Sequence, residues 1–159
     1  EISSVIDWLV MKDNILNIRI NKNKIYLYGH SSGGTLVQHA AALDLRIKGV
    51  LASGSVGPSR ETVGARGVDG GDSIIPALLN WLDTEDILAL IAPRTFVGLS
   101  GDKDHIFPFS GVKKVIILAK AFFIKLKAEK KINYFKVKGK HQYYNKESWK
   151  AWYKFIDPQ

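Results

Sequence analysis

One stretch near the amino terminus restricts the fold of this chain more than any other. From Lys24 an apolar, β-prone run leads to Gly29, and the residues after Gly33 have the pattern of a helix. Between them stands Gly29-His30-Ser31-Ser32-Gly33, a G-x-S-x-G motif. This spacing is typical of a tight strand-to-helix turn, in which the glycines keep Cβ atoms away from the strained backbone. Because the helix amino terminus beside such a serine stabilises developing negative charge, the motif predicts that Ser31 is a nucleophile.

The whole chain alternates between strand-like and helix-like segments. The predicted strands end at Gly29, lie within Leu45–Gly54, and span Thr95–Leu99 and Asn133–Val137. The predicted helices span Ser3–Asn14, the residues after Gly33, a short segment capped by Asp83, Gly111–Lys130, and Lys146–Phe155. This alternation predicts an α/β fold, with a mostly parallel sheet of about four strands and helices on both faces. A length of 159 residues suits one domain, spanning residues 1–159.

Side-chain patterns within the helices add local predictions. Ser3 or Ser4 can cap the first helix, and Trp8 is expected in the core. The long helix predicted for Gly111–Lys130 has an apolar stripe that predicts its buried face. The stripe consists of Val112, Val115, Ile116, Ala119, Phe122, Phe123 and Leu126.

Polar residues with catalytic potential follow three of the predicted strands. Ser31 follows the first strand, Asp102 and Asp104 follow the third, and His141 follows the fourth. The carboxyl ends of parallel strands lie at one edge of a sheet, so these side chains are expected to meet there. A nucleophile, a base and an orienting acid are what acyl transfer through a serine requires. The chain order serine, aspartate, histidine is the one associated with the α/β-hydrolase arrangement.

On these motifs, the chain resembles the carboxyl-terminal half of an α/β hydrolase, nearest to the acetyl xylan esterase and dienelactone-hydrolase-like branch. The resemblance covers nearly all of the chain. The matching pieces are Gly29-His30-Ser31-Ser32-Gly33-Gly34, Leu43-Asp44-Leu45-Arg46-Ile47, Ala92-Pro93-Arg94, Gly101-Asp102-Lys103-Asp104-His105-Ile106-Phe107-Pro108 and Gly139-Lys140-His141-Gln142.

The resemblance implies a role for each matched polar residue. Ser31 corresponds to the family's nucleophile, Asp104 to its acid and His141 to its general base. Asp102 is the alternative acid, although an aspartate after Gly101 more often bonds its own turn backbone. The remaining assignments are the backbone N–H of Ser32 as an oxyanion-hole donor, His30 and His105 as pocket-lining residues, and no metal or cofactor.

The same resemblance implies elements that do not precede the nucleophile strand here. Family members carry further strands in front of it, together with the loop that supplies a second oxyanion donor. We therefore expect a domain incomplete at its amino terminus, with the Ile25–Tyr28 edge of the sheet left open. Because an apolar edge invites pairing with another chain, a homo-oligomer through this edge is expected.

Composition and charge restrict the classes of molecule that this chain is expected to bind. The formal charge is +8, but much of the excess lies between Lys113 and Lys140, where lysines alternate with a helical apolar pattern typical of a solvated helix face. We expect no nucleic-acid partner, because no arginine cluster or aromatic platform accompanies these lysines. No membrane partner is expected, since the longest apolar run, Val115–Ile124, is interrupted by Lys120. The chain has no cysteine, which excludes disulfides and thiolate metal sites, and a cytoplasmic location is favoured.

The long segment from Ser55 to Asn80 is predicted to be irregular and to wall a substrate pocket, with polar candidates Arg60, Arg66, Asp69 and Asp72. The resulting hypothesis is a serine esterase of short acyl esters, including acetylated carbohydrate as a candidate substrate. Two alternatives stay open. One is a prolyl-oligopeptidase-like serine peptidase, and the other is a catalytically incomplete hydrolase fragment that acts as a structural or oligomeric module.

Overall fold

The computed structural model describes residues 1–11, 20–66, 75 and 77–156. Its sheet has four strands in the order β1-β2-β3-β4, and each neighbouring pair is parallel. The strands are β1 (Ile25–His30), β2 (Ile47–Ser53), β3 (Thr95–Gly101) and β4 (Ile132–Val137). The helices are α1 (Ile2–Met11), α2 (Ser32–Leu43), α3 (Ser59–Arg66), α4 (Thr84–Ile91), α5 (Phe109–Lys125) and α6 (Asn145–Ala151). Short 3₁₀ turns lie at Leu78–Asn80 and Glu129–Lys131, and a π-helical turn at Trp152–Ile156 continues α6.

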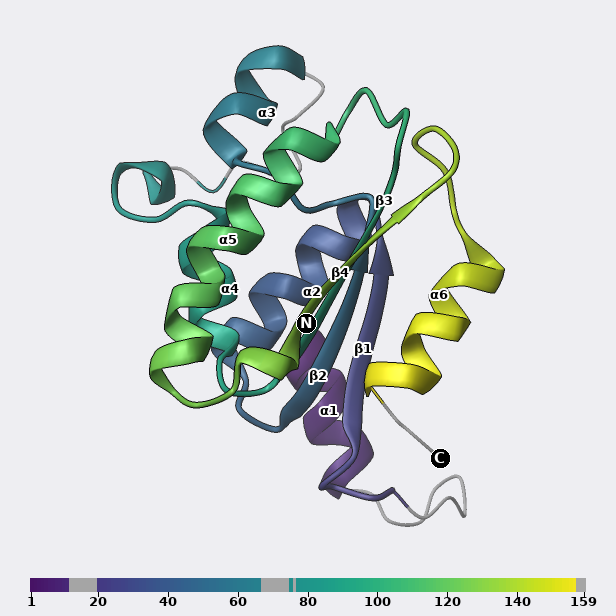
Figure 1. Cartoon of the computed structure of the whole chain (residues 1–159). Coiled ribbons are helices and arrows are strands. Elements are labelled where there is room, and N and C mark those ends of the chain that lie inside the picture. The colour runs from purple at the N-terminus through teal and green to yellow at the C-terminus, as the bar shows by residue number, and fades with distance from the viewer. Residues whose placement is uncertain (12–19, 67–74, 76, 157–159) are drawn as a thin grey trace.

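The helices form a layer on each side of the sheet. Helices α2, α4 and α5 cover one face, while α6 and the turn after it cover the other (Figure 1). The larger core joins α1, α2, α4 and α5 to the sheet, and the smaller one lies beneath α6. The prediction of a parallel α/β sheet with helices on both faces is confirmed.

The strands differ in burial according to their sequence and their position in the sheet. Every residue of β3 and all but Lys48 of β2 are buried, since both strands are apolar and have a strand on each side. All six residues of β1 are only half-buried, because β1 stands at the edge of the sheet. The carboxyl ends of all four strands point to the same side, where the connections into α2, α3, α5 and α6 begin.

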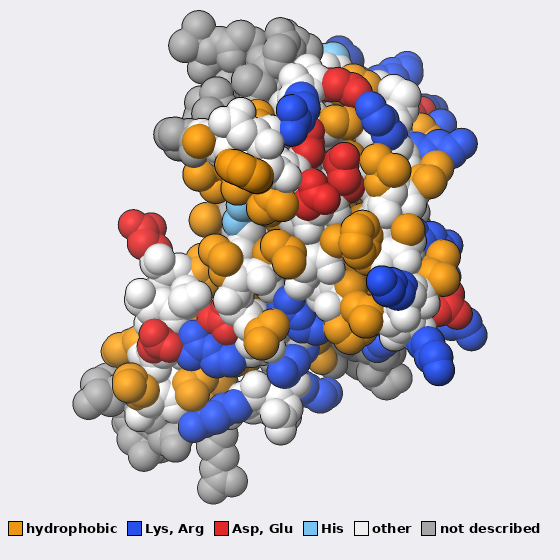
Figure 2. Space-filling model, turned by 90° about the vertical axis from the view of Figure 1, so that its left-hand side faces the viewer, with side chains coloured by type: hydrophobic (Ala, Val, Ile, Leu, Met, Phe, Trp, Pro, Cys, Tyr) orange, Lys and Arg blue, Asp and Glu red, His pale blue; other side chains and the backbone are white. Residues whose placement is uncertain are grey.

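Some local predictions are wrong. Helix α1 starts at Ile2, so Ser3 and Ser4 lie inside it, and Trp8 is 45% exposed rather than in the core. Helix α5 ends at Lys125, and both Phe122 and Leu126 are exposed. The apolar stripe does not mark the buried face there, because apolar residues also occupy the outer face of α5. Lysines separate these outer residues (Figure 2).

The sequence predicts an irregular connection between β2 and α4, but the described part of this connection is not irregular throughout. It contains α3 and the turn at Leu78–Asn80, and Gly64 lies inside α3 without ending it. The prediction that Asp83 caps α4 is confirmed. The Asp83 carboxylate accepts from backbone N–H groups of the first turn, and Asp86 accepts the Asp83 N–H in return. In the part of the chain that the structure describes, no helix combines the length and the apolar character needed to cross a membrane.

Candidate active site

The turn from β1 into α2 holds Ser31 in a conformation that few residues adopt. Ser31 has φ 54° and ψ −125°, and its backbone N–H donates to the Ser53 carbonyl across the sheet at 2.9 Å. A Cβ on Gly29 would lie 2.1 Å from the Gly33 carbonyl oxygen, so only glycine fits at this position. The chain therefore folds back on itself at the end of β1 and presents Ser31 at the start of α2.

The second close approach of this turn is at Gly34. A Cβ on Gly34 would lie 2.1 Å from the Ser55 hydroxyl, whereas one on Gly33 would meet no described atom within 4 Å. The motif predicts that Gly29 and Gly33 are the crowded glycines, and for Gly33 this is wrong. Gly33 takes part only through its backbone carbonyl, which lies against Gly29.

Three residues distant in sequence form one hydrogen-bonded chain at the carboxyl edge of the sheet. The Nε2 atom of His141 lies 2.9 Å from the Ser31 hydroxyl, and its Nδ1 atom lies 2.9 Å from Oδ2 of Asp104. The Asp104 carboxylate only accepts hydrogen bonds, so the imidazole proton belongs on Nδ1 and Nε2 faces the serine as an acceptor. This is the arrangement that lets an imidazole remove a proton from a serine hydroxyl.

The loop after β3 fixes Asp104 by its other oxygen. Oδ1 accepts from the backbone N–H groups of Ile106 and Phe107, each at 2.9 Å, and the side chain is buried. Hydrogen-bond donors of this kind offset the cost of burying a polar side chain. Both of its oxygens are thus satisfied, and Oδ2 is aimed at His141.

Asp102 has a different task two residues earlier. Its Oδ1 accepts from the Gly139 N–H at 2.9 Å, and its own N–H donates to the Val137 carbonyl at 2.7 Å. The structure therefore places Asp102 in the contact between the loop that carries Asp104 and the loop that carries His141. It binds backbone, as expected of a turn aspartate, although the backbone belongs to another loop.

His141 is surrounded by rings and by one glycine. The rings of His30 and Phe107 lie 5.2 Å and 6.0 Å from that of His141, at interplanar angles of 32° and 28°. Gly54, with φ +57°, leaves room for both imidazoles, because a Cβ there would lie 3.0 Å from His30 and 3.2 Å from His141. Burial, and then the neighbouring His141, lower the pKa of His30 below its ordinary value, so His30 stays neutral beside the relay at neutral pH.

The other polar candidates lie apart from the relay. His105 is exposed and lines a separate hollow with Pro58, Glu61 and Ile106. Arg60 forms an ion pair with Asp83 at 3.5 Å. The side chain of Arg66, together with Asp69 and Asp72, lies outside the described residues.

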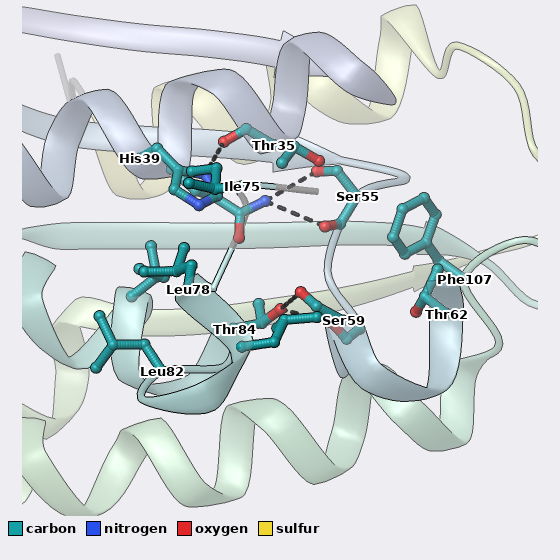
Figure 3. A pocket seen from close by; sticks show the side chains of 14 residues that line it. Thr35, His39, Ser55, Ser59, Thr62, Ile75, Leu78, Leu82, Thr84 and Phe107 are labelled. Carbon is teal, nitrogen blue, oxygen red and sulfur yellow. Dashed lines mark hydrogen bonds between the residues drawn. The ribbon is translucent and has the colours of Figure 1, made fainter. Parts of the chain in front are cut away.

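A pocket lies between α2, α4 and the segment that follows β2. Thr35, Ser55 and Phe107 line its end toward the relay, and Leu78 and Leu82 line its apolar end (Figure 3). Described residues of the segment from Ser55 to Asn80 thus line a pocket, and its use by a substrate stays a prediction. Neither Ser31 nor His141 lines it, so the pocket adjoins the relay through Phe107, whose ring packs on His141.

Sequence reasoning missed Gln38, which is buried at this junction. Its side-chain amide donates to the Gly34 carbonyl at 3.1 Å, to the Ser55 carbonyl at 3.2 Å and to the Ser55 hydroxyl at 3.1 Å. It ties the start of α2 to the end of β2. A single amide in a helix face otherwise made of Val37, Ala40 and Ala41 is the signal that could have identified it.

Solved structures share the fold of this chain. A glucuronoyl esterase from Solibacter usitatus matches with a TM-score of 0.76 and 19% identity, over 97% of this chain and 45% of its own. A glucuronoyl esterase of carbohydrate esterase family 15 from Caldicellulosiruptor kristjansonii matches with a TM-score of 0.76 and 18% identity, over 94% and 46%. The chain has part of an α/β-hydrolase fold.

A solved structure with lower sequence identity shares the same part of the fold. The acylaminoacyl peptidase from Pyrococcus horikoshii matches with a TM-score of 0.64 and 12% identity, over 86% of this chain and 22% of its own. This chain thus spans less than half the length of each of these α/β hydrolases. No protein-family profile and no curated protein sequence matches it. Among the described residues, no group of three or more His, Asp or Glu side chains could hold a metal ion.

Proposed function

We propose that this protein is a serine hydrolase of carboxylic esters. One observation supports this proposal above all others: the hydrogen-bonded chain from Ser31 through His141 to Asp104, with 2.9 Å at each step. Its three members come from the connections after β1, β3 and β4. A serine on a solvated loop without a catalytic role would not require a histidine that is itself held by a buried carboxylate.

The chemistry follows from this geometry. As the Ser31 hydroxyl attacks the acyl carbonyl, its proton moves to Nε2 of His141, and Asp104 stabilises the imidazolium that forms. We assign the backbone N–H of Ser32, the first residue of α2, as a donor to the oxyanion, because a helix start favours negative charge. His141 then protonates the departing alcohol. Water activated by the same imidazole releases the acid from Ser31.

The class of ester is the finer part of the proposal. Short acyl groups, with acetylated carbohydrate as the leading candidate, follow from the resemblance of the sequence motifs to acetyl xylan esterases. The solved structures of similar fold are carbohydrate esterases by name, which supports a carbohydrate ester in general. A panel of acetyl, methyl and glucuronoyl sugar esters would rank these substrates.

Labelling with a fluorophosphonate probe tests the nucleophile directly. We expect labelling of the wild-type chain and its loss in Ser31→Ala. The matched control is Ser32→Ala, because the proposed role of Ser32 needs only its backbone N–H. The Ser32→Ala variant should therefore still be labelled. Labelling that survives in Ser31→Ala would contradict the proposal.

A peptidase is the second candidate, since the fold is shared with an acylaminoacyl peptidase. Turnover of peptide substrates with no turnover of esters would favour it. The third candidate is a hydrolase-like module without turnover. Hydrolysis of p-nitrophenyl acetate that requires Ser31 and exceeds the rate in buffer would exclude it.

A further inference from the structure

His141 lies on the connection from β4 to α6, whose residues 138–144 are all described and form neither helix nor strand. The Nδ1 atom of His141 must nevertheless stay aligned with Asp104 for the relay to work. This connection runs beside the one that follows β3, at the carboxyl edge of the sheet (Figure 1). The contacts that the connection makes there therefore decide where the imidazole lies.

Two hydrogen bonds to the neighbouring connection hold Gly139. Its N–H donates to Oδ1 of Asp102 at 2.9 Å, and its carbonyl accepts the Lys103 N–H at 2.8 Å. These bonds fix the chain two residues before His141. The peptide group that leads directly into His141 contains the carbonyl of Lys140, and a side chain binds that carbonyl.

The side chain is that of Tyr144, whose hydroxyl donates to the Lys140 carbonyl. Tyr144 is 5% exposed, and its own carbonyl accepts the Ser148 N–H at 2.9 Å in the first turn of α6. Because a peptide group is planar, a bond to the Lys140 carbonyl also fixes the orientation of the His141 N–H and of the bond to its Cα. Tyr144 thus connects the start of α6 to the peptide that carries His141.

Two glycines make room for the Tyr144 hydroxyl between the two connections. A Cβ on Gly139, which has φ +147°, would lie 2.6 Å from the hydroxyl oxygen. A Cβ on Gly101 would lie 2.5 Å from the carbonyl oxygens of Gly139 and Lys140, and closer still to the same hydroxyl. Only glycine allows so close an approach, so both connections are shaped around this hydrogen bond.

The Tyr144 hydroxyl also keeps the proton that it donates. Burial, and then the nearby carboxylates of Asp104, Asp102 and Glu147, raise the pKa of Tyr144 above its ordinary value. A phenol is protonated below its pKa, so Tyr144 stays a donor throughout the neutral range.

We propose that Tyr144 is a positioning residue that keeps His141 aligned with Asp104. It acts through the Lys140 carbonyl and the peptide plane that follows, and the inference rests on the proposed function. Without this hydrogen bond, the peptide before His141 gains freedom. The two 2.9 Å hydrogen bonds of the imidazole are then aligned for a smaller fraction of the time, which slows the step in which His141 takes the serine proton.

Tyr144→Phe removes the donor and keeps the buried ring. We expect kcat for ester hydrolysis to fall about tenfold, with KM within about twofold of wild type, because alignment of the relay affects the chemical step more than substrate binding. The matched control is Tyr153→Phe, since Tyr153 is 50% exposed and lies in the turn after α6. The control should retain full activity. Equal kcat in the two variants, measured at matched folded fractions, would overturn the inference.

Nuclear magnetic resonance provides a readout that does not depend on turnover. The Nδ1 proton of His141, assigned by its loss in His141→Gln, should exchange with water about tenfold faster in Tyr144→Phe than in wild type. Tyr153→Phe should leave this exchange rate unchanged. An unchanged rate in Tyr144→Phe would overturn the positioning role alone, whereas turnover that survives in Ser31→Ala would contradict the proposed function.

The unsubstituted chain supplies a further measurement, which holds even if Tyr144→Phe fails to fold. The hydroxyl proton of Tyr144, buried and bonded to the Lys140 carbonyl, should exchange slowly enough to give its own resonance. The exposed hydroxyl of Tyr153 is the reference and should exchange too fast to be seen. A Tyr144 hydroxyl that exchanges as fast as that of Tyr153 would refute the hydrogen bond on which the inference depends.

Discussion

The two ends of the parallel sheet each carry a buried aspartate with a basic partner, and the two sites are built for different purposes. At the carboxyl end, Asp104 holds His141 against Ser31. At the amino end, Asp44 accepts from the backbone and the guanidinium of Arg46, at distances from 2.6 to 3.2 Å.

The amino-end cluster connects elements instead of presenting a reactive group. Arg46 also reaches Asp7 and the Ser3 carbonyl of α1. Arg94, after the end of α4, donates to the carbonyls of Asp44, Ile47 and Leu90, each at 3.0 Å. The Leu43–Ile47 and Ala92–Arg94 motifs, which the resemblance singles out, are therefore explained by structure. The two sites differ in what the basic partner faces: Arg46 contacts other groups that join structural elements, whereas His141 directs its second ring nitrogen at a serine hydroxyl.

Substituting the two aspartates near His141 should give the largest difference in activity. Asp104→Asn should lower kcat by about 10³- to 10⁴-fold, as the corresponding change does in serine proteases, because the amide no longer favours the Nδ1–H tautomer. Asp102→Asn is the control and should retain most of the activity, since Asp102 binds only backbone. Ester hydrolysis by both variants, at matched folded fractions, measures the effect. Activity in Asp104→Asn as high as in Asp102→Asn would show that the relay does not depend on Asp104.

Substitution of two glycines, Gly49 on β2 and Gly54 just after it, should have different effects on activity and on stability. Gly54→Ala should cost about 1–2 kcal/mol of stability for the left-handed backbone and lower kcat by about 10- to 100-fold, because its Cβ displaces His30 and His141. Gly49→Ala, at the amino end, crowds Thr95 at 3.3 Å and should lower stability alone. Urea melts and initial rates distinguish these outcomes. Loss of activity in Gly49→Ala would break the separation of the two ends.

Arg94 should affect stability without affecting turnover. Replacement by Lys removes the planar fork that serves three carbonyls and should cost about 2 kcal/mol of the free energy of unfolding. Arg60→Lys is the matched control, because Arg60 is mostly exposed and makes one long ion pair. Chemical denaturation measures both. A cost as small for Arg94→Lys as for Arg60→Lys would mean that water replaces these hydrogen bonds.

The smallest effect should come from Asp44, and it should depend on pH. The hydrogen bonds from Arg46 hold the pKa of the Asp44 carboxyl well below its usual range. Stability from a lowered carboxyl pKa is complete above the unfolded value of about 4 and is lost as the pH falls through the folded value. Asp44→Asn should therefore cost about 1 kcal/mol at pH 7, and the difference from wild type should shrink below about pH 4. Thermal melts between pH 7 and pH 3 test this, and a constant difference would exclude the ion pair as its cause.

Local patterns predicted the fold to a large extent. The four strands begin and end within a few residues of their predicted bounds, because apolar β-prone runs between glycines and polar turns are local signals. The predicted cap at the start of α1, the predicted end of α5, and the predicted burial of Trp8, Phe122 and Leu126 were wrong, whereas the predicted end of the first helix at Asn14 lies outside the described residues. Burial of a helix residue depends on which elements pack against it, and periodicity alone does not contain this information.

By itself, the sequence determined the alternation of strands and helices, the serine turn, and the set of polar residues at one end of the sheet. Tertiary structure decided which of them meet. It brings together Ser31 and His141, which are 110 residues apart, places Asp102 against backbone, leaves His105 outside, and makes Gly34 rather than Gly33 the crowded glycine. The physical reason is that turn chemistry acts over a few residues. Contact between loops depends on the register of strands that only the packed sheet sets.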